Sequence, residues 1–276
     1  MLLGLLVPSA SVAEPLKLEV MTFNLRYASE IPPNTWTDRR PVVASVLGET
    51  TPDVFGTQEG VWRQIKNIAE DCPDYAWVGL GREGGSRGEF CAIFYRPEKY
   101  ELIAFDHFWL SDTPDVIGSI TWDHQHKRMA TWGRFRERAS NREFAVLNTH
   151  FDHRSELARA NSAVLIRDRI SQFPPELPLL VLGDFNCLAG DGEPYSTLTT
   201  GTGLIDTWTA AEEVNFETAP NTFHGYKSPD TQGRRIDWVL ARNPSKVSRA
   251  QIVTTQIKGQ FPSDHFPVTA TVEFEE

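Results

Sequence analysis

Cysteine is scarce in this sequence, and no pattern divides the chain into separate parts. Only three of its 276 residues are cysteines, at spacings that suit neither a zinc site nor a disulfide framework. We therefore expect buried free thiols at Cys72, Cys91 and Cys187. Linkers rich in Pro, Gly or Ser, charge blocks and internal repeats are absent as well, which favours a single domain over residues 14–276.

Positive charge and long apolar runs are also limited. The formal net charge is −10, so no global field attracts a polyanion, and we expect no stable nucleic-acid complex. After the first residues no stretch is long and apolar enough to span a bilayer, so no transmembrane segment is predicted. Residues 1–13 are mostly apolar and end in small residues, as a secretory signal peptide cleaved after Ala13 does. The sequence thus predicts a secreted or periplasmic protein, and we expect a monomer.

Six short polar motifs stand at the ends of apolar, strand-like runs. Carboxylates, carboxamides and imidazoles are poor strand formers, so six such endings spread along the chain indicate one polar cleft where strand ends meet. Oxygen ligands in such a cleft suit a hard cation such as Mg²⁺ beside a phosphate. The motifs are Thr22-Phe23-Asn24, Gln58-Glu59, Asn148-Thr149-His150, Gly183-Asp184-Phe185-Asn186, Arg235-Ile236-Asp237 and Ser263-Asp264-His265.

Residue periodicity predicts many short strands and a few helices. Helices are expected at residues 38–48, ending at Gly48, at residues 61–70, and from Ser155 to the breaker Pro174. The pattern favours two sheets packed face to face with helices outside. The third helix should bury a stripe formed by Leu157, Ala160, Ala163, Ile166, Ile170 and Phe173. Strands are expected near residues 17–24, 54–58, 76–80, 90–95, 131–136, 143–148, 177–182, 235–241, 250–255 and 268–274.

Taken in order over residues 18–268, the six motifs resemble the endonuclease/exonuclease/phosphatase superfamily. That group includes DNase I-like nucleases, abasic-site endonucleases, inositol polyphosphate 5-phosphatases, secreted sphingomyelinases and the deadenylase/nocturnin-like enzymes. The resemblance implies a four-layer αββα sandwich of the DNase I-like kind, with an active site at one edge where the two sheets open. Gly88-Glu89-Phe90, residues 128–132, Asp152-His153, residues 222–224 and Lys227 are similar to a largely uncharacterised branch near the deadenylase-like enzymes. A superfamily resemblance names no substrate.

The same resemblance implies a metal-dependent hydrolase of phosphate esters that uses Mg²⁺ or Mn²⁺. It implies metal ligation by Asn24, Glu59 and Asp264. It implies catalytic roles for His150, Asp184, Asn186, Asp237 and His265, with either Asp184 or the Asp237–His265 pair as general base. Candidates for contacting the substrate are Asn24, Arg128, His153 and His224.

Three of these substrate assignments have a plain structural alternative. Arg128 has a planar fork that suits a phosphate, but a surface ion pair explains it equally well. His153 and His224 can line a substrate pocket or stand in loops without any role in binding. The sequence leaves these alternatives open.

The expected chemistry needs no covalent nucleophile. Phosphoryl transfer depends mainly on in-line geometry and neutralisation of charge, and no Gly-x-Ser-x-Gly elbow occurs in the sequence. Direct attack by water is therefore the economical mechanism. The substrate is open among a phosphorylated small molecule, a lipid head group and a nucleic acid, as diester or monoester, although the acidic balance favours a small one.

Two other functions compete with this interpretation. A metallo-β-lactamase-type phosphodiesterase is suggested by His150-Phe151-Asp152-His153, but Asn148 stands where the leading histidine of that metal motif is required. A non-catalytic surface or lipid-binding module could also retain the fold. Such a module should have lost at least one group of the site, and all of them are present here.

Overall fold

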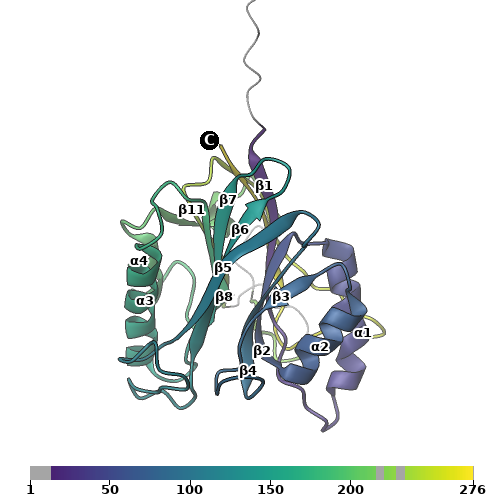
Figure 1. Ribbon diagram of the computed structural model, residues 1–276. Coiled ribbons are helices and arrows are strands. Elements are labelled where there is room, and N and C mark those ends of the chain that lie inside the picture. Colours follow the sequence, from purple (N-terminus) through teal and green to yellow (C-terminus); the bar gives the residue numbers. More distant parts are fainter. Residues whose placement is uncertain (1–13, 216–220, 228–233, 276) are drawn as a thin grey trace, which may run out of the picture.

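Two β-sheets stand face to face between two groups of helices in the computed structural model, which describes residues 14–215, 221–227 and 234–275 (Figure 1). Within these residues the sheets have seven and six strands, in the orders β10-β12-β13-β1-β2-β4-β3 and β5-β6-β7-β8-β11-β9. The predicted four-layer αββα sandwich is confirmed. The predicted signal peptide, residues 1–13, lies outside the described residues.

The first sheet carries helices α1 (Trp36–Thr50) and α2 (Trp62–Asp71) on its outer face, and the second carries α3 (Glu156–Ile170) and α4 (Glu193–Thr199) (Figure 1). The short α5 (Thr207–Ala210) contacts β9, β11, β12 and β13. The first sheet consists of β1 (Leu16–Asn24), β2 (Val54–Val61), β3 (Ala76–Val78), β4 (Glu89–Tyr95), β10 (Glu213–Val214), β12 (Lys246–Ile252) and β13 (Val268–Phe274). The second consists of β5 (Tyr100–Trp109), β6 (Met129–Glu137), β7 (Glu143–His150), β8 (Leu179–Asp184), β9 (Leu204–Asp206) and β11 (Asp237–Arg242).

Alternation along the central strands supplies an apolar layer on both sides of each sheet. In β1, Leu18 and Val20 pack into the core between the sheets, whereas Met21 and Phe23 pack under α1 and α2. Successive side chains of a strand point to opposite faces, so one strand can serve both layers. The central strands are therefore largely buried on both faces, whereas β12 keeps an exposed residue, Arg249, on the first sheet.

Two predictions about helices are wrong in detail. α1 continues past Gly48 to Thr50, and Thr51 takes the left-handed conformation that closes the helix (φ 41°) just before Pro52. α3 buries a stripe shifted from the predicted one, since it includes Ala158 and Ser162, while Leu157 is exposed. A rotation of the helix about its axis by the angle of one residue buries Ala158 in place of Leu157. Such a rotation is easily accommodated because α3 has small residues on several sides.

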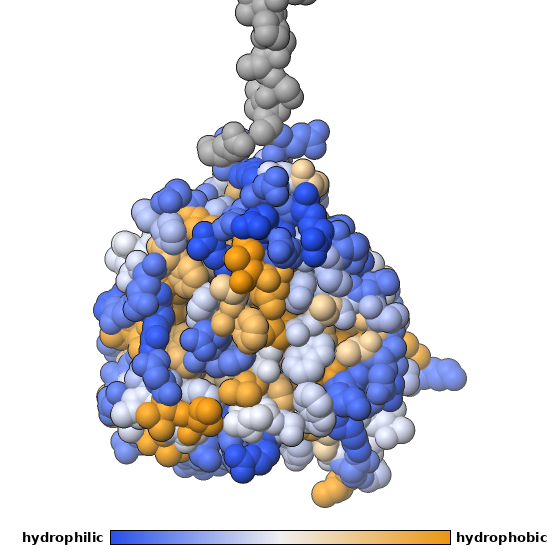
Figure 2. Space-filling view, viewed as in Figure 1, coloured by the Kyte–Doolittle hydropathy of each residue, from blue (hydrophilic) through white to orange (hydrophobic). Residues whose placement is uncertain are grey.

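The three cysteines are free thiols, as predicted, but only Cys91 is buried, whereas Cys72 and Cys187 are half-buried. Among the described residues, none of the helices combines the length and apolarity needed to cross a membrane. On the face shown in Figure 2, apolar side chains gather in the middle of the view, where the edge strand β5 lies in Figure 1; β5 exposes Ile103 and Phe105.

Candidate active site

Strand register in the second sheet sets a histidine and two aspartates side by side. β7 and β8 are parallel, with His150 opposite Asp184. β8 and β11 are antiparallel, with Asp184 opposite Asp237. The ends of β7 and β8 and the start of β11 therefore meet at one edge of the sheet. All three side chains are buried, so each must find its partners within the protein.

Asp184 is the centre of this group. Its carboxylate accepts hydrogen bonds from Asn24 Nδ2 and from the backbone N–H of Asn186, both at 2.9 Å. Burial and the nearby Asp237 charge raise the pKa of Asp184 to about 7, against the opposing charge of His265. The carboxyl group can therefore gain or lose a proton near neutral pH.

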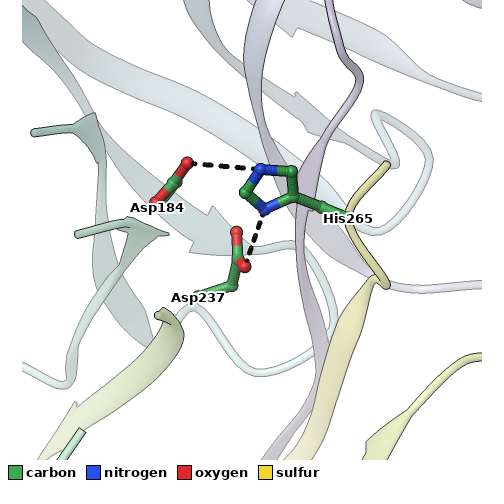
Figure 3. A group of neighbouring side chains, drawn as sticks. All are labelled: Asp184, Asp237 and His265. Carbon is green, nitrogen blue, oxygen red and sulfur yellow. Dashed lines mark hydrogen bonds and ion pairs between the residues drawn. The ribbon is translucent and has the colours of Figure 1, made fainter. Parts of the chain in front are cut away.

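His265 lies between the two aspartates, as Figure 3 shows. Its Nδ1 is 2.9 Å from Asp237 Oδ2, and its Nε2 is 3.8 Å from Asp184 Oδ2. Burial lowers the pKa of His265, but Asp237 and Asp184 outweigh this effect and raise it to about 10. His265 is then an imidazolium at neutral pH. The three groups are close enough to surround a metal ion, yet the Nδ1 atom is already bound to Asp237, so an ion-paired chain fits them better.

The first sheet contributes a second set of oxygens. β1 and β2 are parallel with Asn24 opposite Gln58, which brings the next residue, Glu59, beside Asn24. Glu59 Oε1 accepts from Asn24 Nδ2 at 3.3 Å, and Oε2 accepts from the Tyr27 N–H at 3.2 Å. Burial raises the pKa of Glu59, but the charges of His265 and Arg26 outweigh burial and hold it below its usual value. Glu59 is therefore ionised, with Asn24 as a bridge to Asp184.

Asp264 adds a further carboxylate to the same cavity. Arg26 Nε lies 3.7 Å from its Oδ2. Burial, reinforced by the negative charge of Glu59, raises the pKa of Asp264 above its usual range. The two carboxylates therefore repel each other, which is the electrostatic situation that a bound cation relieves.

A buried arginine fixes the loops that carry these groups. Arg39 of α1 is fully buried and makes no ion pair with a carboxylate among the described residues. It donates hydrogen bonds to backbone carbonyls on both sides of the site, and so ties the segment after Asn24 to the segment before Asp264. The accepting carbonyls belong to Leu25, Arg26, Tyr27, Asn34 and Pro262.

His150 stands between an arginine and the Asp184 carboxylate. Arg128 Nη1 lies 3.0 Å from His150 Nδ1, and His150 Nε2 lies 3.3 Å from Asp184 Oδ2. Asn186 Nδ2 lies 3.1 Å from the same Nε2 and also donates to the Phe151 carbonyl at 3.1 Å. Burial, with the charges of Arg128 and His265, holds the pKa of His150 well below its usual value. His150 is therefore neutral.

Two residues of the sequence motifs join the sheets instead of lining the site. Gln58 Nε2 donates to Asn148 Oδ1 at 2.7 Å, and Asn148 Nδ2 donates to the carbonyls of Thr57 and Ala92, both at 2.9 Å. Gln58 and Ala92 belong to the first sheet and Asn148 to the second. These polar side chains are fully buried, so their hydrogen bonds also fix the distance between the sheets.

A cavity of about 450 Å³ opens above these groups. Most of the predicted site residues line it, whereas Asn24 and Asp237 lie buried behind the lining and act on it through Glu59, Asp184 and His265. The residues in the lining that the sequence assigned to the site are Glu59, Arg128, His150, His153, Asp184, Asn186, Asp264 and His265. The lining residues without an assigned role are Arg26, Tyr27, Arg82, Glu89, His126, Phe223 and Ile236, of which Glu89, Phe223 and Ile236 stand in the sequence motifs.

Besides Asn24, the three other candidate substrate contacts differ in their surroundings. Arg128 is buried in the cavity wall, with its second nitrogen, Nη2, 3.3 Å from His153 Nδ1. His153 lines the cavity with its ring stacked on His126 at 5.8 Å. His224 does not line the cavity: it is buried against Phe266, with ring centroids 3.9 Å apart.

The cavity residues that sequence patterns miss come from loops and strand starts. Arg82 donates to Glu89 Oε2 at 2.7 Å, which ties two segments that both reach the cavity. Glu89 belongs to the Gly88-Glu89-Phe90 motif, so the sequence singled it out but predicted no role for its side chain. Arg26 follows Asn24 by two residues and takes a left-handed conformation (φ 52°), which no strand pattern predicts.

Comparison with known proteins identifies a family and several relatives of this chain. A sequence profile of the Endonuclease/Exonuclease/phosphatase family matches residues 21–265. Nocturnin of Drosophila melanogaster is 28% identical over 196 residues, which are 66% of this chain and 29% of that protein. The chain spans 29% to 59% of the length of four curated relatives that it matches.

Solved structures are similar over nearly the whole chain. An endonuclease/exonuclease/phosphatase from Bacteroides vulgatus is 32% identical with a TM-score of 0.88, covering 94% of this chain and 100% of that one. A mannosyl-6-phosphatase from Bacteroides thetaiotaomicron is 30% identical with a TM-score of 0.84, covering 93% of this chain and 100% of that one.

Proposed function

This chain belongs to the Endonuclease/Exonuclease/phosphatase family, and on that premise we propose that it hydrolyses phosphate esters by direct attack of water, with a divalent cation, Mg²⁺ or Mn²⁺, in the cavity. The observation that carries the proposal is the convergence of Glu59, Asp184 and Asp264 on one cavity beside the charged His265. Remote carboxylates are rarely buried together unless they have such a task.

The side chains of the cavity fit a hard cation. Glu59 and Asp264 offer carboxylate oxygens, the ligands that Mg²⁺ prefers, and their mutual repulsion favours a positive ion between them. Asn24 presents its NH₂ group to Glu59 and Asp184, so it suits orienting those carboxylates better than binding the cation. The cation, when bound, neutralises charge on the phosphate and polarises its oxygens.

The residues of the second sheet supply the proton transfer. We assign Asp184 as the general base, because its pKa of about 7 lets it accept a proton from water at neutral pH. His265 cannot accept one, since its pKa of about 10 keeps it charged. The imidazolium instead stabilises negative charge on the phosphoryl oxygens in the transition state, and Asp237 holds its ring in place.

A small phosphate monoester, such as a sugar phosphate, is the substrate class that we favour. A cavity of about 450 Å³ has the size of a small-molecule site, and the net charge of −10 opposes long polyanions. The likeness to a mannosyl-6-phosphatase at 30% identity points in the same direction.

The proposal is tested by assaying the protein with hexose 6-phosphates, p-nitrophenyl phosphate and bis-p-nitrophenyl phosphate, with Mg²⁺ or Mn²⁺ and with a chelator. We expect metal-dependent release of phosphate from the monoesters, lost in Asp184→Asn and kept in Asp168→Asn, which changes an exposed aspartate of α3. Hydrolysis of the diester alone would replace the monoester class by a phosphodiesterase. No hydrolysis together with no metal binding would favour the non-catalytic module.

A further inference from the structure

The contact between Arg128 and His150 restricts where the imidazole can carry its proton. Arg128 is 5% exposed, and its Nη1 lies 3.0 Å from His150 Nδ1. A guanidinium has five N–H donors, no acceptor, and does not lose its proton in proteins. The Nδ1 atom must therefore accept, which leaves Nε2 as the protonated nitrogen of the neutral ring.

We propose that Arg128 is a positioning residue that holds His150 as the neutral Nε2–H tautomer, so that this N–H and the Asn186 amide form a pair of donors for one phosphoryl oxygen. The inference rests on the proposed function for the nature of the ligand, a phosphate ester. It assigns to Arg128 an action through His150 and no direct clamp on the phosphate.

The surroundings of Nε2 fit a pair of donors. Asn186 Nδ2 lies 3.1 Å from His150 Nε2, and its amide orientation is set by a hydrogen bond to the Phe151 carbonyl. Both nitrogens then present hydrogens beside the cavity that His150 and Asn186 line. In the substrate-free site, Asp184 Oδ2 is a carboxylate oxygen 3.3 Å from Nε2. A phosphoryl oxygen that enters can accept from both donors at once.

The opposite tautomer, with its proton on Nδ1, is disfavoured because it would place two hydrogen-bond donors against each other. A proton on Nδ1 would stand against the N–H of Arg128 at 3.0 Å, and both groups are buried. The arginine cannot turn an acceptor toward the ring, because it has none. Asn186, by contrast, can direct its second hydrogen to the substrate while it keeps its bond to Phe151. The buried charge therefore decides the tautomer, and the amide adapts to it.

The consequence for the reaction is a division of roles. His150 donates a hydrogen bond and keeps its proton throughout, whereas Asp184 accepts the proton of the attacking water and His265 stays charged. A prearranged donor of this kind contributes when charge develops on the phosphoryl oxygens, and loss of one such donor lowers kcat about 10²-fold or more.

The direct test is nitrogen-15 NMR of the whole protein with labelled histidine, at neutral pH and without metal or substrate. We expect His150 to show an unprotonated Nδ1 and a protonated Nε2, with its signals assigned by their loss in His150→Gln. Arg128→Gln, whose side chain can also accept, should release the ring to a mixture of tautomers. The control Arg167→Gln removes an arginine of α3 that pairs with Asp168 at the surface and should leave the pattern unchanged. A protonated Nδ1 in the wild-type protein overturns the inference, even if the Arg128 variant does not fold.

Kinetics supply the second readout. Arg128→Lys keeps a donor at Nδ1 and should retain more kcat than Arg128→Gln, for which we expect about a 10²-fold loss with KM changed much less. Equal losses in both variants contradict the positioning role. If the wild-type protein hydrolyses no phosphate ester, the proposed function fails, while the NMR experiment still decides the tautomer.

Discussion

Asp237 shows how a residue outside the cavity can control a residue inside it. Its carboxylate binds His265 Nδ1 at 2.9 Å and is the largest positive contribution to the raised pKa of that ring. Asp237→Asn keeps the shape but removes the charge. We expect the His265 pKa to fall from about 10 and kcat to drop by about 10- to 100-fold, measured by NMR titration and steady-state assay of the metal-loaded enzyme.

A buried aspartate elsewhere is the control for this variant. Asp53 binds Lys99 and the Glu19 N–H away from the cavity. Asp53→Asn should lower the melting temperature without moving kcat. If Asp237→Asn lowers only the melting temperature as well, then Asp237 is a structural residue and not the partner that sets the charge of His265.

His224 gives a prediction for stability against pH. Burial between Phe261 and Phe266 lowers its pKa from 6.5 to about 4. Between about pH 6.5 and pH 4, His224 is therefore protonated in the unfolded chain but not in the folded protein. The free energy of unfolding consequently decreases as pH falls through this range, by about 3 kcal/mol at most. His224→Leu removes this group, and its melting temperature should fall less steeply between pH 7 and pH 4 than that of the wild type. Parallel curves for the two proteins would show that His224 contributes nothing to the pH dependence.

Sequence patterns locate site residues when a polar side chain interrupts a strand. Asp184 directly follows a run of buried apolar residues, and a carboxylate there demands a partner. The same reasoning finds Glu59 and His265. It does not find Arg82 or His126, because each lies in a loop, between β3 and β4 and between β5 and β6 respectively, whose path depends on tertiary contacts. It also cannot separate His153, which lines the cavity, from His224, which is buried behind it.

At the scale of elements, the second sheet packs directly against the backbone of Gly56 of β2. A Cβ atom there would lie 2.1 Å from Leu182 Cδ1 and 2.6 Å from Asn148 Cγ, both on the opposite sheet. Gly56→Ala therefore forces the sheets apart or displaces the hydrogen bonds of Asn148. We expect a loss of about 1–3 kcal/mol in the free energy of unfolding, measured by denaturant titration.

Gly48 is the matched control for that substitution. It lies within α1, and a Cβ atom there would meet nothing within 4 Å. Gly48→Ala should stabilise the protein by up to about 1 kcal/mol, because alanine restricts the unfolded chain and favours the helix. Equal effects at the two glycines would contradict the close approach of the sheets.

The elements that sequence patterns miss are the short and the exposed ones. All ten predicted strands exist, whereas β5, β9 and β10 were not indicated. β5 is an edge strand with both faces partly in solvent, so it lacks a clear alternation of apolar and polar residues. β9 and β10 have three and two residues, too few for any periodicity. Core strands are predictable because burial on both faces leaves them a nearly continuous apolar pattern.

At the scale of the whole molecule, the sandwich sets carboxylates from opposite sheets around one cavity. Glu59 lies at the bulge of β2 in the first sheet, and Asp184 ends β8 in the second. Asn24 bridges these two carboxylates with one amide group. The site therefore exists only while the sheets are packed, and binding of a cation in this cavity should stabilise the entire fold.

This coupling yields a prediction for thermal stability. Without a cation, Glu59 and Asp264 repel each other across the cavity, and a ligand that binds only the folded state adds about 2.7 kcal/mol at 100 times its Kd. We expect Mn²⁺ to raise the melting temperature and a chelator to reverse the rise. Glu59→Gln should require a much higher Mn²⁺ concentration for the same increase, because one ligand charge is gone. Glu156→Gln, which removes an equal charge from the exposed start of α3, should respond as the wild type does. The same Mn²⁺ response in both variants would show that Glu59 is not a ligand.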